Sequence, residues 1–315
     1  MEWRRMSRGD RRFLLSLIPF PLILLGVLLS MLAVFIIKSL PILEKEGLSV
    51  FTTNVWRASE TNPAAEQYGL LAAIWGSVYT GIIAVLVGGA LSIGFAVTVE
   101  ELAGGRIREL LSGLMDMMAA TPTIIYGLWG VVYLAPLLRN YVYLPLHRYL
   151  GWLPFFQEYP TTGYTIGTAG VLLGIMITPY AAMIIREAYA SIPFSLREAA
   201  YGIGATRFEA IRLQLGLVKP AVISALVLGY GRAIGETVAV ALVVGNCRSI
   251  TLSITAPGIT VASLIASMFK AAAYYHYMES ALYAGGLALF LIGLAVNLAG
   301  LYLVRRWEEK WAKYM

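Results

Sequence analysis

The sequence has very few of the residues from which most catalytic, metal and disulfide sites are built. It contains one cysteine, Cys247, and two histidines, His147 and His276, among 315 residues. A single cysteine excludes an internal disulfide framework, and two histidines in separate predicted loops argue against a histidine-rich metal site. The motif Gly-x-x-x-x-Gly-Lys-Ser/Thr is absent, so the chain has no P-loop with which to bind ATP.

Charged residues are also scarce. Asp, Glu, Lys and Arg make up 13% of the chain, against about 25% in soluble domains. Hydrophobic residues make up 59%, and the mean hydropathy is +0.73. Because a soluble chain of this length could not bury so much apolar surface, the sequence indicates a protein that lies in a bilayer. Membrane topology explains the net charge of +6 better than nucleic-acid binding does.

Six long segments with little or no charge predict membrane-spanning helices. Each exceeds the ~20 residues needed to cross ~30 Å of hydrocarbon. The fifth contains only Arg232 and Glu236, and the other five contain no Asp, Glu, Lys or Arg. The six segments are 13–37, 67–99, 117–138, 159–185, 220–244 and 280–304.

A further uncharged segment, 249–269, leaves the number of crossings at six or seven. Basic residues precede the first span and follow the last, so the positive-inside rule places both termini in the cytoplasm and requires an even number. Six crossings put 16 of the 24 Lys and Arg residues inside and 7 outside, with Arg232 in the membrane. We therefore predict an all-α membrane protein with six transmembrane helices, with 249–269 as an external re-entrant or interfacial segment. Without a clear internal repeat, residues 1–315 are expected to form one domain.

The predicted cytoplasmic loop 186–219 has the pattern of a docking surface. Ser195 and Glu198 fit a capping box with Ser195 as the N-cap, which predicts a short helix. Gly204 then allows a sharp turn before a second helix. A helix with small apolar residues fits a groove on another protein, although the same pattern also occurs in a loop that only links two spans.

Three stretches resemble a family of transport proteins. Residues 198–204, Glu-Ala-Ala-Tyr-Gly-Ile-Gly, resemble the EAA loop of ABC-importer permeases, which docks on a separate ATPase subunit. Residues 116–130 (Asp-Met-Met-Ala-Ala-Thr-Pro-Thr-Ile-Ile-Tyr-Gly-Leu-Trp-Gly) and 231–240 (Gly-Arg-Ala-Ile-Gly-Glu-Thr-Val-Ala-Val) resemble two segments of phosphate ABC permeases. The Gly-Asn pair at 245–246 resembles the PstC-type subunit more than the PstA-type subunit. The loop departs from the family pattern because Pro220 comes later than the usual Leu-Pro ending.

The resemblance implies a type I ABC-importer permease fold in a prokaryotic cytoplasmic membrane, and a transport subunit rather than an enzyme. Its implied partners are a homologous PstA-type permease subunit, two ATP-binding subunits on the cytoplasmic side, an extracytoplasmic phosphate-binding protein and the lipid bilayer, with no nucleic acid. The chain would need no cofactor or metal, since the partner ATPase would bind ATP. The residues expected to couple it to that ATPase are Glu198, Ala199, Ala200, Gly204 and Arg207.

Two charges in the fifth span carry the prediction about substrate. Arg232 would lie ~20 Å into that span, where a charge costs ~2.5–3.5 kcal/mol on insertion scales. Glu236, four residues later, would lie on the same helical face and could pair with it. An arginine fork also matches phosphate oxygens, so Arg232 either contacts an anion or only pairs with Glu236.

Three further residues are pathway candidates: Thr237, Tyr126 and Asp116. Tyr126 could equally pack within the protein. Asp116 would lie near the N-terminal end of the third span, where an acid also interacts favourably with the helix dipole. Pro122, in the same span, is expected to bend it.

Other functions remain possible at this point. The nearest alternative is a permease for another oxyanion, such as sulfate or molybdate. A secondary transporter would need no ATPase partner. An intramembrane enzyme would need a catalytic set, and the predicted spans contain neither a His/Glu metal motif nor a Ser–His arrangement.

Overall fold

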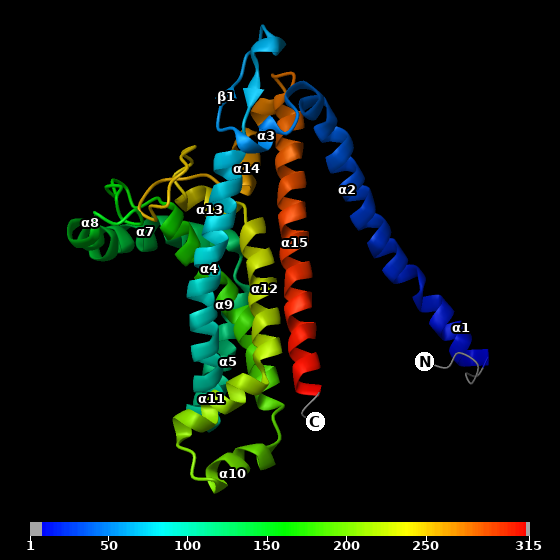
Figure 1. Cartoon of the computed structure of the whole chain (residues 1–315), viewed down its shortest axis with the longest axis vertical. Helices are drawn as coiled ribbons and strands as arrows, with labels where there is room; N and C mark the ends of the chain where they lie inside the picture. Colours follow the sequence, from blue (N-terminus) through cyan, green and yellow to red (C-terminus); the bar gives the residue numbers. More distant parts are fainter. Residues whose placement is uncertain (1–7, 313–315) are drawn as a thin grey trace.

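The computed structural model describes residues 8–312, which form an almost entirely helical structure (Figure 1). Among these residues, four helices are long and apolar enough to span a membrane, and up to six spans result if each of two bent helix pairs counts as one. Arg4, Arg5 and Lys313, which contribute to the predicted orientation, lie outside the described residues. Those four spans are formed mainly by α2 (Pro19–Glu46), α4 (Leu71–Val97), α9 (Ile166–Ala190) and α15 (Met278–Ala312). Helix α12 (Lys219–Gly235) belongs to one of the bent pairs.

The packing of α4 against α9 forms the centre of the molecule. Glycines on both helices bring the two backbones close together, since a Cβ at Gly88 would lie 2.6 Å from the carbonyl oxygen of Gly174. A Cβ at Gly174 would in turn lie 2.8 Å from the side chain of Val87. Small residues of this kind are typical of helix interfaces in membranes, where close van der Waals packing stabilises the association.

The third predicted span is not a straight helix. Helix α5 (Gly105–Ala120) ends before Pro122, and the helical segment 123–150 then continues at 97° to it. The prediction of a bend at Pro122 is confirmed, whereas the prediction of one span over 117–138 is wrong in shape. Proline has no backbone N–H and disfavours the helical conformation of the residue before it, so Thr121 is extended, with ψ 129°.

The segment 123–150 projects sideways from the helices that run along the long axis (Figure 1). It contains three short α-helices separated by two π-helical turns, Gly130–Leu134 and Arg139–Tyr143. The α-helices are α6 (Thr123–Trp129), α7 (Ala135–Leu138) and α8 (Leu144–Leu150).

The fifth predicted span, 220–244, is also broken. Helix α12 ends at Gly235, Glu236 is extended with ψ 129°, and α13 (Val238–Val243) follows. The Glu236 carboxylate accepts a hydrogen bond from the backbone N–H of Ala239, at 3.4 Å. This side chain thus satisfies one of the free N–H groups at the start of α13, which stabilises the break.

One end of the molecule is closed by short elements around a buried carboxylate. Helix α3 (Ser49–Thr52) and the antiparallel pair β1 (Trp56–Arg57) and β2 (Gln67–Tyr68) lie there. Glu66 is fully buried and accepts hydrogen bonds from the Tyr68 hydroxyl, at 2.9 Å, and from two backbone N–H groups just before α15. The hairpin was not predicted from the sequence.

Helix α2 is attached at this same end. Its Ile42 N–H donates a hydrogen bond to the Ser280 hydroxyl of α15, at 3.0 Å. Away from this contact α2 diverges from α15 (Figure 1), and none of its most apolar 18-residue window is buried within the chain. A long apolar helix with so little intramolecular cover needs lipid or another subunit beside it.

Segment 249–269 does not form a seventh span. It runs without regular structure as far as Thr260 and then enters α14 (Val261–Ala272), whose 12 residues reach only ~18 Å. Hydrogen bonds fix the segment to the start of α4, where Trp75 Nε1 donates to the carbonyl of Thr251 and the Ser77 hydroxyl accepts from the N–H of Val261. The structure therefore agrees with the predicted re-entrant or interfacial segment.

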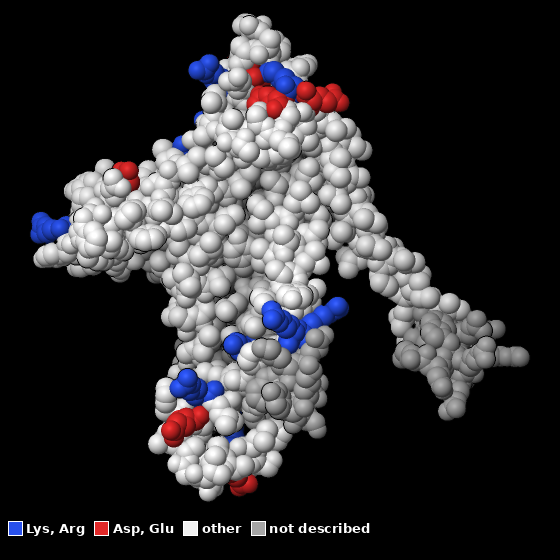
Figure 2. Space-filling model, viewed as in Figure 1, with Lys and Arg blue, Asp and Glu red and all other residues white. Residues whose placement is uncertain are grey.

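On the face shown in Figure 2, charged side chains gather toward the two ends of the molecule and on the part that projects to the left, and most of the remaining surface carries none. The described end of α15 and helix α1 (Arg8–Leu17) lie toward the same end as the two helices of the loop 186–219, α10 (Phe194–Gly202) and α11 (Arg207–Leu217) (Figure 1). The arrangement is that of a bilayer-spanning protein whose described terminal helices end on one side.

The close contact of α4 with α9 predicts that alanine changes stability differently at two glycine positions of α4. Gly88→Ala should lower stability by about 1–3 kcal/mol, because the new methyl group would overlap the Gly174 carbonyl. Gly94→Ala, on the same helix, should be neutral or stabilise by up to about 1 kcal/mol, since a Cβ there meets nothing within 4 Å. Thermal unfolding of the two purified variants in detergent measures the difference. Equal unfolding temperatures would contradict the proposed role of Gly88.

Candidate functional site

Helix α10 (Phe194–Gly202) forms the tip of one end of the molecule (Figure 1). Its N-cap residue is Pro193, so the prediction that Ser195 is the N-cap is wrong. Pro193 has φ −56° and ψ 136°, and it follows the turn at Ser191 and Ile192 that ends α9. Its fixed φ suits the start of a helix. Ser195 therefore lies within the first turn, and no side chain caps this helix.

The predicted turn after α10 is present. Gly204 has φ +84°, a conformation that glycine adopts without steric cost. Its N–H donates to the carbonyl of Tyr201, and the N–H of Ala205 donates to that of Ala200. The turn directs the chain into the second predicted helix, α11 (Arg207–Leu217).

A capping box lies at the start of α11 rather than α10. The Glu209 carboxylate accepts from the Thr206 N–H at 2.7 Å, and the Glu209 N–H donates to the Thr206 hydroxyl at 3.4 Å. The Thr206 backbone and hydroxyl hydrogen bonds lower the pKa of Glu209. The Thr-x-x-Glu pattern was visible in the sequence and was missed, because the Ser-x-x-Glu pattern eleven residues earlier had the same form.

The tip formed by α10 and the following turn exposes large apolar side chains. Phe194 is 71% exposed, Ile203 is 84% exposed and Phe208 is 72% exposed. At the end of a protein that faces water, such side chains mark a surface that a partner covers. Of the predicted coupling residues, Glu198, Ala199 and Gly204 lie on this exposed tip.

The other two predicted coupling residues make contacts within the chain. Ala200 is 5% exposed and packs within the chain. The Arg207 guanidinium donates a hydrogen bond to the backbone carbonyl of Glu101, at the end of the segment that continues α4. These two residues hold the loop against the rest of the molecule, whereas Glu198, Ala199 and Gly204 lie on its exposed tip.

The predicted pairing of Arg232 with Glu236 is wrong. The two would share a helical face only if α12 continued past Gly235, and the break after Gly235 separates them. Among the described residues, no carboxylate lies within 4.0 Å of the Arg232 guanidinium. Its guanidinium carbon instead lies 4.1 Å from the centre of the Tyr180 ring, on α9, in a cation–π contact.

Arg232 is exposed in the single chain and lies beside the bend between α5 and α6. The Tyr180 hydroxyl donates to the carbonyl of Ala119, and the Tyr126 hydroxyl donates to the carbonyl of Met118, both at 2.8 Å. Two tyrosines therefore donate hydrogen bonds to carbonyls in the last turn of α5, where the helix has few N–H partners of its own to offer. Tyr126, predicted as a pathway residue, thus lies near Arg232 with its hydroxyl already bonded to the backbone.

Asp116 lies in a different environment from the one predicted. Helix α5 begins at Gly105, so Asp116 is one turn from its C-terminal end rather than near its N-terminal end. The helix dipole disfavours an acid there, and the side chain is exposed in the single chain. The prediction that Asp116 interacts favourably with the helix dipole is therefore wrong. Its role as a pathway candidate stays a prediction.

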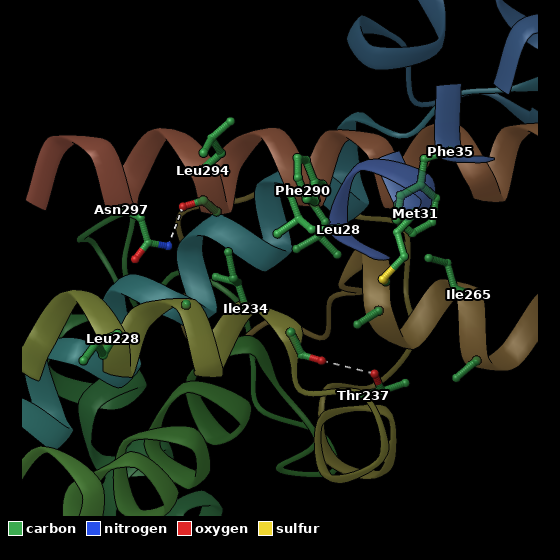
Figure 3. Close-up of a pocket in the computed structure, with 17 residues that line it drawn as sticks. Leu28, Met31, Phe35, Leu228, Ile234, Thr237, Ile265, Phe290, Leu294 and Asn297 are labelled. Carbon is green, nitrogen blue, oxygen red and sulfur yellow. Dashed lines mark hydrogen bonds between the residues drawn. The ribbon is translucent and has the colours of Figure 1, made fainter. Parts of the chain in front are cut away.

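Thr237 lies at the break after α12 and lines a large groove (Figure 3). The cavity has a volume of about 980 Å³ and opens between α2, α12, α14 and α15. Apart from Thr237 and Asn297, its lining side chains are apolar, and none is charged. The groove therefore does not provide an anion site, but it suits the apolar side chains of a neighbouring helix.

Two of the lining glycines, Gly231 and Gly235, lie on the same helix as Arg232. A Cβ on Gly235 would meet nothing within 4 Å, and one on Gly231 only the Asn297 side chain at 3.9 Å. The helix therefore leaves room for a close neighbour on one side and carries Arg232 beside Tyr180 on another. Within the part of the chain that the structure describes, no group of three or more His, Cys, Asp or Glu residues could hold a metal.

Comparison with known proteins indicates the same family of transport proteins over most of the chain. Residues 91–309 match the family model described as binding-protein-dependent transport system inner membrane component. The chain is 45% identical over 309 residues to a probable phosphate transport system permease protein PstC of Methanocaldococcus jannaschii, covering 98% of both chains. It is 33% identical over 300 residues to the phosphate transport system permease protein PstC of Haemophilus influenzae, covering 92% of this chain and 91% of the relative.

Two solved structures share the fold. One is a bacterial ABC transporter involved in the import of the acidic polysaccharide alginate, with a TM-score of 0.60 and 15% identity over 94% of this chain and 96% of that chain. The other is an inward-facing conformation of the MetNI methionine ABC transporter, with a TM-score of 0.55 and 17% identity over 76% of this chain and 95% of that chain. The expected type I ABC-importer permease fold is thereby confirmed.

Proposed function

Because this chain belongs to the family of binding-protein-dependent transport system inner membrane components, we propose that it is the phosphate-specific permease subunit of an ATP-driven importer. The observation that carries the proposal is the 45% identity to a phosphate transport permease over 98% of both chains. Permeases of this family are multi-pass membrane subunits without an ATPase site, and they work with an ATPase and a substrate-binding protein. The absence of a P-loop agrees with this division of labour.

The finer assembly is also proposed. A homologous PstA-type subunit would pair with this chain, two ATP-binding subunits would bind below, and a phosphate-binding protein would dock on the opposite side. The apolar groove between α2 and α15 supports the first contact, because an uncovered helix and an uncharged groove fit a helix of a second permease. ATP would be bound by the ATPase, and the permease would use no cofactor of its own.

In this assembly the end that carries α10 faces the cytoplasm. The basic residues of the sequence are concentrated in the segments at that end, and its exposed Phe194 and Ile203 provide an apolar surface for the ATPase. ATP-driven closure of the ATPase pair would move α10 and switch the pathway from inward-open to outward-open.

The proposed orientation can be tested by labelling. With Cys247→Ser as the background, Ala205→Cys should react with a membrane-impermeant maleimide only from the cytoplasmic side, and Glu60→Cys only from the outside. Ala205 follows α10 and Glu60 follows β1, and these two elements lie toward opposite ends of the structure (Figure 1). Reaction of both variants from the same side would reject the six-span orientation.

Phosphate specificity can be tested with the complete importer. The complex reconstituted in proteoliposomes should take up radiolabelled phosphate in an ATP-dependent manner, and excess sulfate or molybdate should compete poorly. Competition by sulfate at concentrations equal to those of phosphate would favour the other oxyanion permease. Uptake without any co-purified ATPase would favour a secondary transporter instead.

Arg232 is proposed to contact the anion on the translocation path. No carboxylate neutralises it among the described residues, so its charge is available to a ligand. Hydrogen bonds to charged groups contribute about 1.5–3 kcal/mol, which corresponds to a roughly 10- to 100-fold change in affinity. Arg232→Gln should therefore lower phosphate uptake by about that factor.

The variant Arg232→Lys should restore uptake only in part, because lysine has no planar fork for two phosphate oxygens. The double variant Arg232→Gln with Glu236→Gln should take up phosphate no better than Arg232→Gln alone, since the structure separates the two side chains. Arg106→Gln, which removes an exposed charge at the start of α5, provides the matched control and should transport normally. Recovery of uptake in the double variant would overturn the proposed anion contact.

A further inference from the structure

Two adjacent carboxylates lie where α4 ends, at the same end of the molecule as α10. Beyond Val97 the helix widens into a π-helical turn, Thr98–Leu102, which contains Glu100 and Glu101. Both side chains are only 9% exposed. Such extra turns place consecutive side chains in directions that a regular α-helix does not provide, and they are frequent at functional sites.

Glu100 faces the neighbouring spans. Its carboxylate forms an ion pair with Arg108 of α5, and the Arg186 guanidinium of α9 lies 3.9 Å from it. Arg186 also donates a hydrogen bond to the Ser112 hydroxyl of α5, at 2.6 Å. Glu100 therefore holds the ends of α4, α5 and α9 together.

Glu101 faces the coupling loop instead. Its carboxylate lies 3.5 Å from Nη1 of Arg197, on α10, and accepts a hydrogen bond from the Tyr189 hydroxyl, on α9, at 2.9 Å. The Arg197 guanidinium also lies over the Tyr189 ring, 5.4 Å from its centre. The backbone carbonyl of Glu101 accepts from Arg207, the first residue of α11.

One residue at the end of α4 thus contacts α9 and both helices of the loop. Arg197 immediately precedes Glu198, which is on the exposed tip, and its own side chain is directed back into the protein. Among the described residues, Glu101 is the one carboxylate that forms an ion pair with Arg197. The Nε atom of Arg197 is buried and has no hydrogen-bond partner among those residues. Tyr189 is fully buried, so it shields the Glu101–Arg197 ion pair from water on the side that faces α9.

Resting on the proposed function, we infer that Glu101 is the positioning residue through which movement of α10 reaches the membrane spans. The Glu101–Arg197–Tyr189 contact fixes the direction of α10 relative to the ends of α4 and α9. A displacement of α10 by the ATPase then displaces those ends as well. Without the contact, α10 would be held by the packing of Ala200 and by the short connections 191–193 and 203–206, with no ion pair to the end of α4. Helix α10 could then move more independently of the spans.

The test compares ATP hydrolysed with phosphate imported in the complete reconstituted importer. Glu101→Gln keeps the size of the side chain but removes the charge that holds Arg197. Subunit assembly and ATP hydrolysis should persist, whereas the number of ATP molecules hydrolysed per phosphate imported should rise at least about fivefold. A purely structural role would lower assembly, hydrolysis and uptake together and would leave this ratio unchanged.

Glu100→Gln is the matched control, because Glu100 contacts Arg108 and Arg186 but neither residue of the loop helices. It should change the ratio by less than about twofold. Tyr189→Phe removes a single buried hydroxyl and should raise the ratio in the same direction as Glu101→Gln, by a smaller factor. This mild variant decides the question if Glu101→Gln fails to assemble.

The double variant Glu101→Gln with Arg197→Gln should have the same ratio as Glu101→Gln alone, since both changes remove one contact. Unchanged ratios in Glu101→Gln and Tyr189→Phe would overturn the inference. An equal rise in Glu100→Gln would also overturn it, because the effect would then follow any loss of charge at the end of α4. Failure of the wild-type complex to import phosphate would overturn the proposed function itself, and this inference with it.

Discussion

The close packing of α4 against α9 is the contact on which the rest of the structure depends. Gly88 and Gly174 bring the two backbones together, and no larger residue fits between them. Helix α12 packs on both, and its Gly229 meets Ile177 of α9. In a bilayer, where lipid tails are as apolar as the side chains, this kind of fit stabilises a helix assembly better than hydrophobicity does. The remaining elements are arranged around this rigid centre.

The two helix breaks are explained by their place in that packed arrangement. Helix α5 ends just before Pro122 and α12 ends at Gly235, and in both places backbone groups lose their helical partners. Tyr126 and Tyr180 satisfy carbonyls at the first break, while Glu236 satisfies an N–H at the second. Non-helical backbone at membrane depth is tolerated only where protein or a water-filled path surrounds it. Arg232 beside Tyr180 is therefore placed where a solute path through the membrane is physically reasonable.

The same centre also connects the two ends of the molecule. Glu66, shortly before α4, accepts hydrogen bonds from two backbone N–H groups just before α15. Glu100 and Glu101, just after α4, bind arginines of α5, α9 and α10. Burying a carboxylate costs free energy unless hydrogen-bond donors or cations surround it, so each end is a specific set of contacts rather than a loose loop. Helix α4 thus runs between two polar clusters, one on the proposed external side and one at the proposed ATPase side.

The sequence by itself determined the membrane class, the approximate positions of the spans and the loop that carries Glu198 and Gly204, because hydropathy and turn chemistry are local properties. Tertiary structure decided the rest. Whether Arg232 pairs with Glu236 depends on where α12 ends. The break there is stabilised by a hydrogen bond that the Ala239 N–H donates to the Glu236 carboxylate, and residue spacing alone does not reveal it. Ser195 and Thr206 begin equivalent capping patterns, and only the chain geometry set by Pro193 selects the second. The Glu101–Arg197 contact joins residues 96 positions apart, so it exists only once α4, α9 and α10 are packed together.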